Sequence, residues 1–304
     1  MGLRASIDIG TNSTRLLLGD ISSSGLIKPV LYREKMTKLG AGLTASGHLD
    51  DTAIHKVIEV LLDYKQQLSR YNVEAIHVFA TSAAREARNQ SYLLDLIYTR
   101  TGYRLRILTG EEEAQLSFWV AISDANLKST YVVCDIGGGS SEFIYGHGRQ
   151  YDFVASLNIG SGRLTRQFLH NEPPKVQNID RLLQHVRAQL GSGLQRRNKP
   201  ADIIAVGGTA ATLAMMAGRI PIDQPLRAHH LRLDRKHLTF LIDTLSQMDF
   251  AAKEDLIGLD PQRADIILAG ALIFSEIMNY FQSQTMVISL RDLLFGILIE
   301  ENER

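Results

Sequence analysis

The chain has 304 residues, of which 45% are hydrophobic and 22% are charged, so it is long enough for two domains of ordinary size and is not of the intrinsically disordered class. Its 33 basic residues balance 33 acidic ones, so no net field favours nucleic acid or an anionic membrane as a partner. The single cysteine, Cys134, excludes an internal disulfide and a thiolate-based zinc site.

The sequence opens with three predicted strands that follow one another without a helix. An apolar run ends at Asp8, a turn of small residues covers Gly10 to Ser13, and a second strand reaches Asp20. Residues 22–25 stop that strand and leave no room for a helix, which excludes the strand-turn-helix start of dinucleotide-binding and P-loop folds. A third strand follows over residues 26–38.

Helices and strands then alternate along the chain. Residues 51–71 carry apolar side chains at helical spacing, with Asp50 or Asp51 as the N-cap. The first unit is expected to continue with a strand at 75–80, a helix at 90–101 and a strand at 104–108. Later we expect a helical stretch at 164–194, a strand at 202–206, helices at 209–217, 235–246 and 263–280, a strand at 285–288 and a last helix from about Arg291. This alternation predicts mostly parallel sheets with helices on both faces.

The opening hairpin has a second copy later in the chain. The two segments are residues 8–19, DIGTNSTRLLLG, and residues 135–146, DIGGGSSEFIYG, and their offset is constant, since 135 − 8 = 127 and 146 − 19 = 127. A third strand over 150–157 follows the second copy, as residues 26–38 follow the first. Two such starts separated by helical sequence predict two related lobes, residues 1–124 and residues 125–290.

Three glycine-rich turns are candidate phosphate sites, because a backbone without Cβ lets several N–H groups approach one anion. They are Gly10-Thr11-Asn12-Ser13, Gly137-Gly138-Gly139-Ser140 and Gly207-Gly208-Thr209. The third turn also opens a predicted helix, whose N-terminal amides favour an anion. One such turn alone is explained as well by a tight hairpin, whereas two matched copies and a third favour a phosphate cradle.

The charged residues differ between the two copies. Asp8 matches Asp135, but Arg15 in the first copy aligns with Glu142 in the second. Together these hairpins would offer a guanidinium for phosphate oxygens and carboxylates for a hard cation, although Arg15 or Glu142 alone is explained as well by an outward-facing strand residue. Residues 111–113 are three glutamates at the start of an apolar stretch, where acids commonly suit the helix dipole, so only one of them need be catalytic.

Other features point to structure rather than to chemistry. His229 and His230 are adjacent and would face opposite ways on a strand, and the sequence contains no His-x-x-x-His or Cys-x-x-Cys pair. The basic residues of 196–199 are expected in a solvated connection, and Trp119 is expected in the core. The sequence contains no Walker lysine signature, Gly-x-Ser-x-Gly elbow or Gly-x-Gly-x-x-Gly motif.

We expect a cytoplasmic location. The N-terminus lacks the basic region, apolar segment and small-residue cleavage site of a secretory signal. The longest uncharged run, residues 203–218, is interrupted by the third glycine turn and is shorter than a bilayer span. A single thiol also fits a reducing compartment.

Taken together, five motifs resemble the exopolyphosphatase/guanosine pentaphosphate phosphatase (Ppx/GppA) family, a branch of the superfamily of actin, sugar kinases and acetate kinases. The motifs are IDIGTNSTRL at 7–16, ATSAAREA at 80–87, TGEEEA at 109–114, DIGGGSSE at 135–142 and GGT at 207–209, with looser matches at 263–265 and 289–296. The resemblance covers nearly the whole chain. It implies two actin-like, ribonuclease H-like lobes with mixed sheets flanked by helices, a cleft between the lobes, and a C-terminal helix, about 291–304, packed on the first lobe.

The resemblance also implies a role for each matching position. Glu113 would be the general base that activates the attacking water, and Arg15 would neutralise charge on the transferring phosphoryl group. Arg85 and Arg263 would guide the polyanion. The implied ligands of Mg²⁺, or of a similar divalent cation, are Asp135, Glu142 and Asp8, and a monovalent cation is a second candidate cofactor. The implied phosphate-binding residues are Thr11, Asn12, Ser13, Gly137, Gly138, Gly139, Ser140, Gly207, Gly208 and Thr209.

The implied activity is that of an exopolyphosphatase, which hydrolyses the terminal phosphoanhydride of linear polyphosphate and releases orthophosphate. A guanosine pentaphosphate 5′-phosphohydrolase would use the same chemistry, and the sequence does not separate the two substrates. The lack of further C-terminal domains leads us to expect short or medium polyphosphate. A small-molecule kinase of the superfamily and a non-catalytic sensor of a phosphorylated metabolite are more distant alternatives, and Glu113 argues against the sensor. The resemblance is also consistent with a homodimer.

Overall fold

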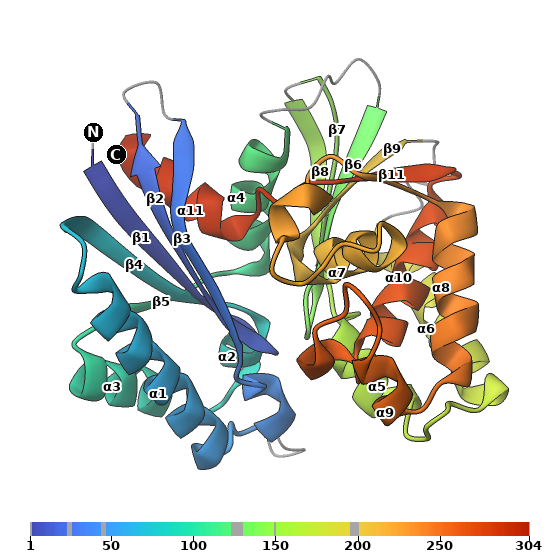
Figure 1. Ribbon diagram of the computed structural model, residues 1–304, viewed down its shortest axis with the longest axis horizontal. Helices are drawn as coiled ribbons and strands as arrows, with labels where there is room; N and C mark the ends of the chain where they lie inside the picture. The colour runs from blue at the N-terminus through green and yellow to red at the C-terminus, as the bar shows by residue number, and fades with distance from the viewer. Residues whose placement is uncertain are drawn as a thin grey trace. The chain divides into compact units, whose positions relative to one another are not determined.

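The structure is a computed structural model that describes residues 2–22, 26–43, 47–122, 130–148, 150–194 and 201–303 (Figure 1). The chain divides into two compact units, of which unit 1 comprises Met1–Val120 with Leu293–Arg304 and unit 2 comprises Ala121–Asp292. The expected connection at 196–199, the expected lobe boundary at 124 and the side chain of Trp119 lie outside the described residues. Within the described ranges, no helix is both long enough and apolar enough to cross a membrane.

Unit 1 contains a five-stranded mixed sheet with the strand order β3-β2-β1-β4-β5. The strands are β1 (Gly2–Ile9), β2 (Ser13–Ile21), β3 (Ile27–Met36), β4 (Val73–Ala80) and β5 (Leu105–Ile107). The first three pair antiparallel, because the short turns between them cannot carry a crossover, whereas β1, β4 and β5 are mutually parallel. The predicted start of three consecutive strands is therefore confirmed.

Helices cover both faces of this sheet (Figure 1). They are α1 (Asp51–Leu68), α2 (Ser82–Glu86), α3 (Gln90–Thr101), α4 (Gly110–Ile122) and α11 (Leu293–Glu303), with a 3-10 turn η1 (Leu39–Gly42). Alternation along β2 places Leu16 and Leu18 in the core with α1 and α3, and Leu17 in the core with α11. Of the two predicted N-caps, Asp50 and Asp51, the structure has Asp50, whose carboxylate accepts a hydrogen bond from the N–H of Thr52.

The C-terminal helix α11 belongs to unit 1 and packs on its sheet. The hydroxyl of Ser6 on β1 donates to the carbonyl of Leu294, near the start of the helix, at 2.8 Å. This bond gives a partner to a buried hydroxyl of the sheet and to a buried carbonyl of the helix. Helix α11 also approaches α4 closely, since a Cβ added at Gly296 would lie 2.4 Å from the carbonyl oxygen of Leu116. Glycine at position 296 therefore lets α11 and α4 pack together with backbone in contact.

Unit 2 contains a six-stranded mixed sheet with the strand order β10-β11-β9-β6-β7-β8. The strands are β6 (Thr130–Ile136), β7 (Ser141–His147), β8 (Gln150–Leu157), β9 (Asp202–Val206), β10 (Arg232–Asp234) and β11 (Thr285–Ile288). In its hairpin Asp135 pairs with Glu142, just as Asp8 pairs with Arg15 in unit 1. The 127-residue offset therefore preserves the register of the hairpin as well as its sequence pattern.

The helices of unit 2 flank its sheet, and most of them contribute to one large core. They are α5 (Ser161–Phe168), α6 (Val176–Gly193), α7 (Gly207–Ala217), α8 (Arg235–Gln247), α9 (Phe250–Glu254) and α10 (Ile267–Tyr280), with 3-10 turns η2 (Pro225–Ala228) and η3 (Pro261–Arg263). The core includes Val132, Cys134 and Ile136 of β6, which alternate along the strand and so share one face of the sheet.

Three expectations differ from the structure. The sheets are mixed, as the resemblance implies, rather than mostly parallel as the alternation predicts, because each three-strand start contributes two antiparallel ladders and β10 adds another. The helical stretch at 164–194 is two helices, since Pro173 and Pro174 interrupt the pattern. His229 and His230 precede β10 in a turn, where a φ of 63° at His230 brings the two rings together with centroids 3.8 Å apart.

Candidate active site

In each unit the predicted site residues lie at one edge of the sheet. The parallel strands β1, β4 and β5 of unit 1 run directly into the first glycine turn, helix α2 and helix α4. In unit 2 the parallel strands β6 and β9 run into the second and third glycine turns. Carboxyl ends of parallel strands share an edge, and this edge is where open α/β sheets bind ligands.

The first glycine turn is held by backbone hydrogen bonds that orient its peptides. The N–H of Gly10 donates to the carbonyl of Ser13 at 2.9 Å. The carbonyl of Asn12 accepts from the N–H of Lys38 at 2.7 Å, and that of Thr11 accepts from the N–H of Gly40 at 2.8 Å. In a planar trans peptide the C=O and N–H point in opposite directions. The N–H groups of residues 12 and 13 are therefore directed away from the segment that holds the turn.

Asp8 and Arg15 form a buried ion pair across the first hairpin. The Nε and Nη2 atoms of Arg15 donate to Oδ2 of Asp8 at 3.1 and 2.6 Å, and the two residues are only 8% and 4% exposed. Opposite positions on adjacent antiparallel strands place both side chains on the same face, which is why the pair forms. The carboxylate of Asp8, predicted from the resemblance as a cation ligand, thus carries a guanidinium.

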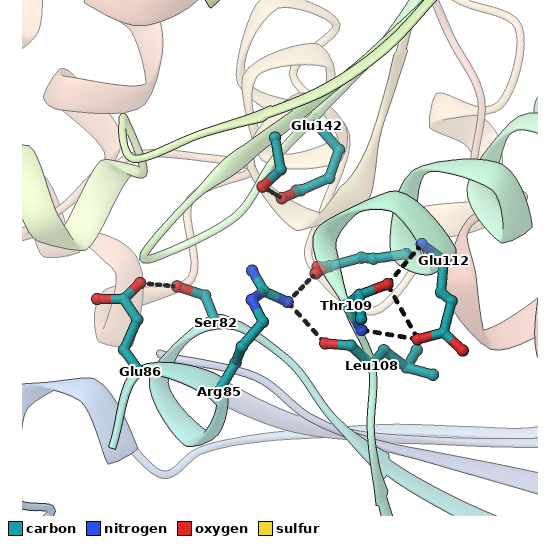
Figure 2. A network of polar contacts seen from close by, with 9 residues as sticks. Ser82, Arg85, Glu86, Leu108, Thr109, Glu112 and Glu142 are labelled. Atoms are coloured by element: carbon teal, nitrogen blue, oxygen red, sulfur yellow. Dashed lines mark hydrogen bonds and ion pairs between the residues drawn. The ribbon is translucent and has the colours of Figure 1, made fainter. Parts of the chain in front are cut away.

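The structure gives each of the three consecutive glutamates a different environment. Glu111 is exposed. Glu112 forms a capping box at the start of α4, because its carboxylate accepts from the N–H of Thr109 at 2.8 Å while its own N–H donates to the Thr109 hydroxyl at 3.1 Å (Figure 2). The pKa of Glu112 lies below its ordinary value. The main cause is the hydrogen bond from the Thr109 N–H, and the next is a hydrogen bond from the side chain of Arg106. Glu113 is buried at 7% exposure.

Arg85 connects helix α2 to Glu113. Its Nη1 donates to the carbonyl of Leu108 at 2.9 Å (Figure 2). The same atom donates to the Glu113 carboxylate at 3.1 Å. The carbonyl of Arg85 accepts in turn from the side chain of Gln90. Of the three glutamates, Glu113 is therefore the one that is buried, ionically paired and fixed in position, as a general base must be.

The second glycine turn repeats the geometry of the first and is held more extensively. The N–H of Gly137 donates to Ser140 at 3.0 Å, as Gly10 does to Ser13. The carbonyls of residues 137, 138 and 139 all accept hydrogen bonds from the start of α5, where the donors are the N–H groups of residues 161, 163 and 160. By the same peptide geometry, the three N–H groups of Gly138, Gly139 and Ser140 are directed away from α5, as an anion-binding nest requires.

Asp135 and Glu142 replace the ion pair of the first hairpin with two carboxylates. They lie directly opposite each other on β6 and β7, so their Cβ atoms are about 4.5–5.5 Å apart on one face. They are 9% and 2% exposed. An oxygen of Glu142 accepts from the hydroxyl of Ser156 at 2.8 Å.

The third glycine turn packs against Asp135 in the same unit. Gly207 has a φ of +83°, and a Cβ added there would lie 2.2 Å from Oδ1 of Asp135. A Cβ at Gly208 would lie 2.3 Å from the guanidinium of Arg263, which is buried. The hydroxyl of Thr209 donates to the carbonyl of Ile136 at 2.9 Å, so this side chain ties α7 to the second turn and leaves its backbone N–H as the group that can face an anion.

The pair Asp135 and Glu142 fits a hard divalent cation. Acidic residues directly opposite each other on a sheet repel, and a divalent ion would relieve that repulsion. Across the residues that the structure describes, no group of three or more His, Cys, Asp or Glu side chains is placed to hold a metal. Mg²⁺ nevertheless suits the pair, since it is commonly held by one or two carboxylates together with water and phosphate oxygens.

Sequence reasoning missed the residues that hold the two turns. In unit 1 these are Lys38 and Gly40, and in unit 2 they are Gly160, Ser161 and Arg163. Most act through backbone N–H groups, which any residue supplies, so side-chain chemistry gives no signal. The available signal was positional, since in both copies the holding segment directly follows the third strand.

Comparisons with known proteins agree over almost the whole chain. The model of the Ppx/GppA phosphatase family matches residues 19–304. The chain is 30% identical to "Exopolyphosphatase 2" of Mycobacterium tuberculosis, over 97% of each protein. It is 31% identical to a "Bifunctional 3-dehydroquinate synthase/phosphatase" of Fusobacterium nucleatum over 98% of this chain, and it spans 46% of that longer relative. A solved structure of the Aquifex aeolicus Ppx/GppA enzyme matches 98% of this chain and 99% of its own, with a TM-score of 0.81 and 28% identity.

Proposed function

Because the chain belongs to the Ppx/GppA phosphatase family and has its actin-like α/β fold, we propose that it is an exopolyphosphatase that releases orthophosphate from the end of linear polyphosphate. Phosphoanhydride hydrolysis is the reaction of this family of hydrolases. The choice of polyphosphate as the substrate is supported by the exopolyphosphatase of M. tuberculosis, which the chain matches over 97% of each protein.

The observation that carries the proposal is that the three glutamates divide into an exposed residue, a helix cap and a buried carboxylate paired with Arg85. A phosphate-binding protein needs oriented amides but has no need of a carboxylate fixed by a guanidinium. Glu113 is such a carboxylate, held by Arg85 at 3.1 Å. Its burial and fixed orientation support a hydrolase over a non-catalytic sensor.

In the proposed mechanism, Glu113 accepts a proton from the water that attacks the terminal phosphorus in line with the departing chain. On unit 2, the N–H groups of Gly138, Gly139 and Ser140 bind phosphate oxygens of the substrate, and the helix N-terminus at Gly207 adds further N–H donors. Arg15 reduces the negative charge that builds up during transfer. Positioning and charge neutralisation supply most of the rate enhancement in phosphoryl transfer, because a loose transition state needs little covalent catalysis from the protein.

Asp135 and Glu142 are the residues proposed to hold Mg²⁺. When bound, the cation would neutralise charge on the phosphate oxygens and on the leaving group. Asp135→Asn and Glu142→Gln should each shift the Mg²⁺ concentration that gives half-maximal phosphate release to higher values. An unchanged Mg²⁺ titration in both variants would remove these residues from the cation site.

The substrate proposal is tested by measuring phosphate release from linear polyphosphate and from guanosine pentaphosphate under the same conditions. We expect a higher kcat/KM for polyphosphate. A higher value for guanosine pentaphosphate would instead assign the nucleotide as the substrate, and release from neither would refute both assignments.

We also propose a cytoplasmic location and a homodimer. The location is supported by Cys134, which is the only cysteine and is buried as a free thiol. Cell fractionation and sedimentation velocity test the two statements separately, and a monomer across a tenfold range of concentration would exclude the dimer.

A further inference from the structure

We infer that Arg163 is a positioning residue that aims the N–H groups of the second glycine turn at the substrate phosphate. The inference rests on the proposed function in taking phosphate as the anion bound there. Arg163 lies in the first turn of α5, and its Nε donates to the carbonyl of Gly139 at 2.7 Å. Its backbone N–H donates to the carbonyl of Gly138 at 2.8 Å.

One residue therefore fixes two consecutive peptides of the turn. The carbonyl of Gly138 shares a peptide plane with the N–H of Gly139, and the carbonyl of Gly139 shares one with the N–H of Ser140. Because both carbonyls accept hydrogen bonds from Arg163 on α5, the N–H groups of Gly139 and Ser140 point away from α5. Glycine peptides rotate more freely than any others, so without this restraint the turn would lose the orientation that makes it a nest.

The side-chain hydrogen bond does more than the backbone contacts around it. The carbonyl of Gly139 also accepts from the N–H of Gly160, but at 3.3 Å, so the shorter bond from the Arg163 guanidinium at 2.7 Å is the stronger restraint. A cationic donor on the carbonyl also polarises the peptide, which makes the N–H of Ser140 a better donor to an anion.

The close approach that this contact needs is built into the sequence at Gly160. A Cβ added there would lie 2.4 Å from the N of Gly139 and 2.5 Å from the carbonyl carbon of Gly138. Any larger residue would push the start of α5 off the turn. The hydroxyl of Ser161 adds a contact to the carbonyl of Gly137 at 3.2 Å.

The first turn supplies an internal comparison. There the carbonyls of Thr11 and Asn12 accept from the backbone N–H groups of Gly40 and Lys38. The second turn has the same register and the same closing bond from residue 137 to residue 140, but adds a guanidinium behind it. The addition falls on the copy whose hairpin carries two carboxylates, where the anion most needs strong donors.

The test compares Arg163→Lys and Arg163→Met with Arg181→Met, which removes an exposed arginine from α6. Lysine keeps the positive charge but places a methylene where the Nε–H of arginine donates. Affinity for orthophosphate is measured by calorimetry with Mg²⁺ present, KM and kcat are measured on linear polyphosphate, and thermal melting confirms folding.

We expect both Arg163 variants to bind orthophosphate about tenfold or more weakly, a loss of about 1.4 kcal/mol or more in binding free energy, because the N–H groups of the turn lose their fixed orientation. KM should rise by a similar factor with kcat little changed, as expected for lost binding common to ground and transition states. Arg181→Met should match the unsubstituted protein in affinity and KM.

Two results would overturn the inference. Unchanged orthophosphate affinity in Arg163→Met would show that the guanidinium does not orient the turn, and full affinity in Arg163→Lys would show that only charge matters. The calorimetry is independent of turnover. A protein that binds orthophosphate but releases none from polyphosphate would therefore refute the proposed function while leaving the role of Arg163 supported.

Discussion

Substitution of Glu113 by glutamine separates catalysis from folding. Glutamine has the same shape as glutamate and keeps an oxygen that can accept from Nη1 of Arg85, now 3.1 Å from the carboxylate. The change therefore replaces a charge-assisted hydrogen bond, worth about 1.5–3 kcal/mol, with a neutral one worth about 0.5–1.5 kcal/mol. Arg85 keeps its bond to the Leu108 carbonyl and some access to solvent, so we expect stability to fall by about 1 kcal/mol.

The loss of activity should be much larger than that. A positioned general base contributes about 10²–10⁴ in rate, which is about 3–5 kcal/mol of activation free energy. Phosphate release from polyphosphate should fall by this factor in kcat, while calorimetric binding of orthophosphate stays close to the unsubstituted value. Urea unfolding measures the stability change in parallel.

Glu111→Gln is the matched control, because it removes the same charge from an exposed position two residues away on α4. It should leave kcat and stability nearly unchanged. If Glu113→Gln kept kcat within about tenfold of the unsubstituted protein, Glu113 would not be the base. If Glu111→Gln lost as much activity, the effect would belong to the charge of the helix terminus rather than to proton transfer.

Two further predictions concern the capping box and the third turn. Hydrogen bonds, of which that from the Thr109 N–H is the largest cause, lower the pKa of Glu112 in the folded protein. The ionised Glu112 therefore contributes to stability above the ordinary carboxyl pKa, and this contribution is lost as pH falls through the lowered pKa of the folded state. Glu112→Gln should therefore be less stable than the unsubstituted protein in urea unfolding at pH 7, and the difference should shrink toward pH 3; a gap that is constant with pH would contradict this. Gly207→Ala introduces a Cβ 2.2 Å from the Asp135 carboxylate at a φ of +83°. Orthophosphate affinity should therefore fall at least tenfold, and the melting temperature should drop. Unaltered binding would show that the turn tolerates the displacement.

The opening hairpins were predictable because their register follows from local rules. A turn of fixed length between two apolar strands leaves one pairing that keeps the apolar residues on the buried faces. A constant offset of 127 residues then carries the pairing of Asp8 with Arg15 to that of Asp135 with Glu142. What the sequence did not reveal is that the first pair closes into an ion pair, since the resemblance assigned Asp8 to a cation and Arg15 to phosphate.

Contacts made through backbone atoms were beyond sequence reasoning. The partner of Arg163 is the carbonyl of Gly139, and every residue has a carbonyl. Strand β10 was missed for a related reason, because three residues are too few to show alternation. The separate roles of Glu112 and Glu113 likewise depend on where α4 begins, and helix boundaries are the least certain feature of a periodic pattern.

The two hairpins show how one exchanged residue changes the function of a repeated element. With arginine at position 15 the two facing side chains carry opposite charges, and Oδ2 of the buried aspartate accepts from the guanidinium. With glutamate at position 142 the same register places two buried acidic residues directly opposite each other. Like charges directly opposite on a sheet are destabilising, and natural proteins keep such conflicts where function requires them. The hydroxyl of Ser156 offsets part of this cost, and binding a divalent cation would offset more, so the hairpin that folds less favourably by itself is the one suited to hold a cation beside a phosphate.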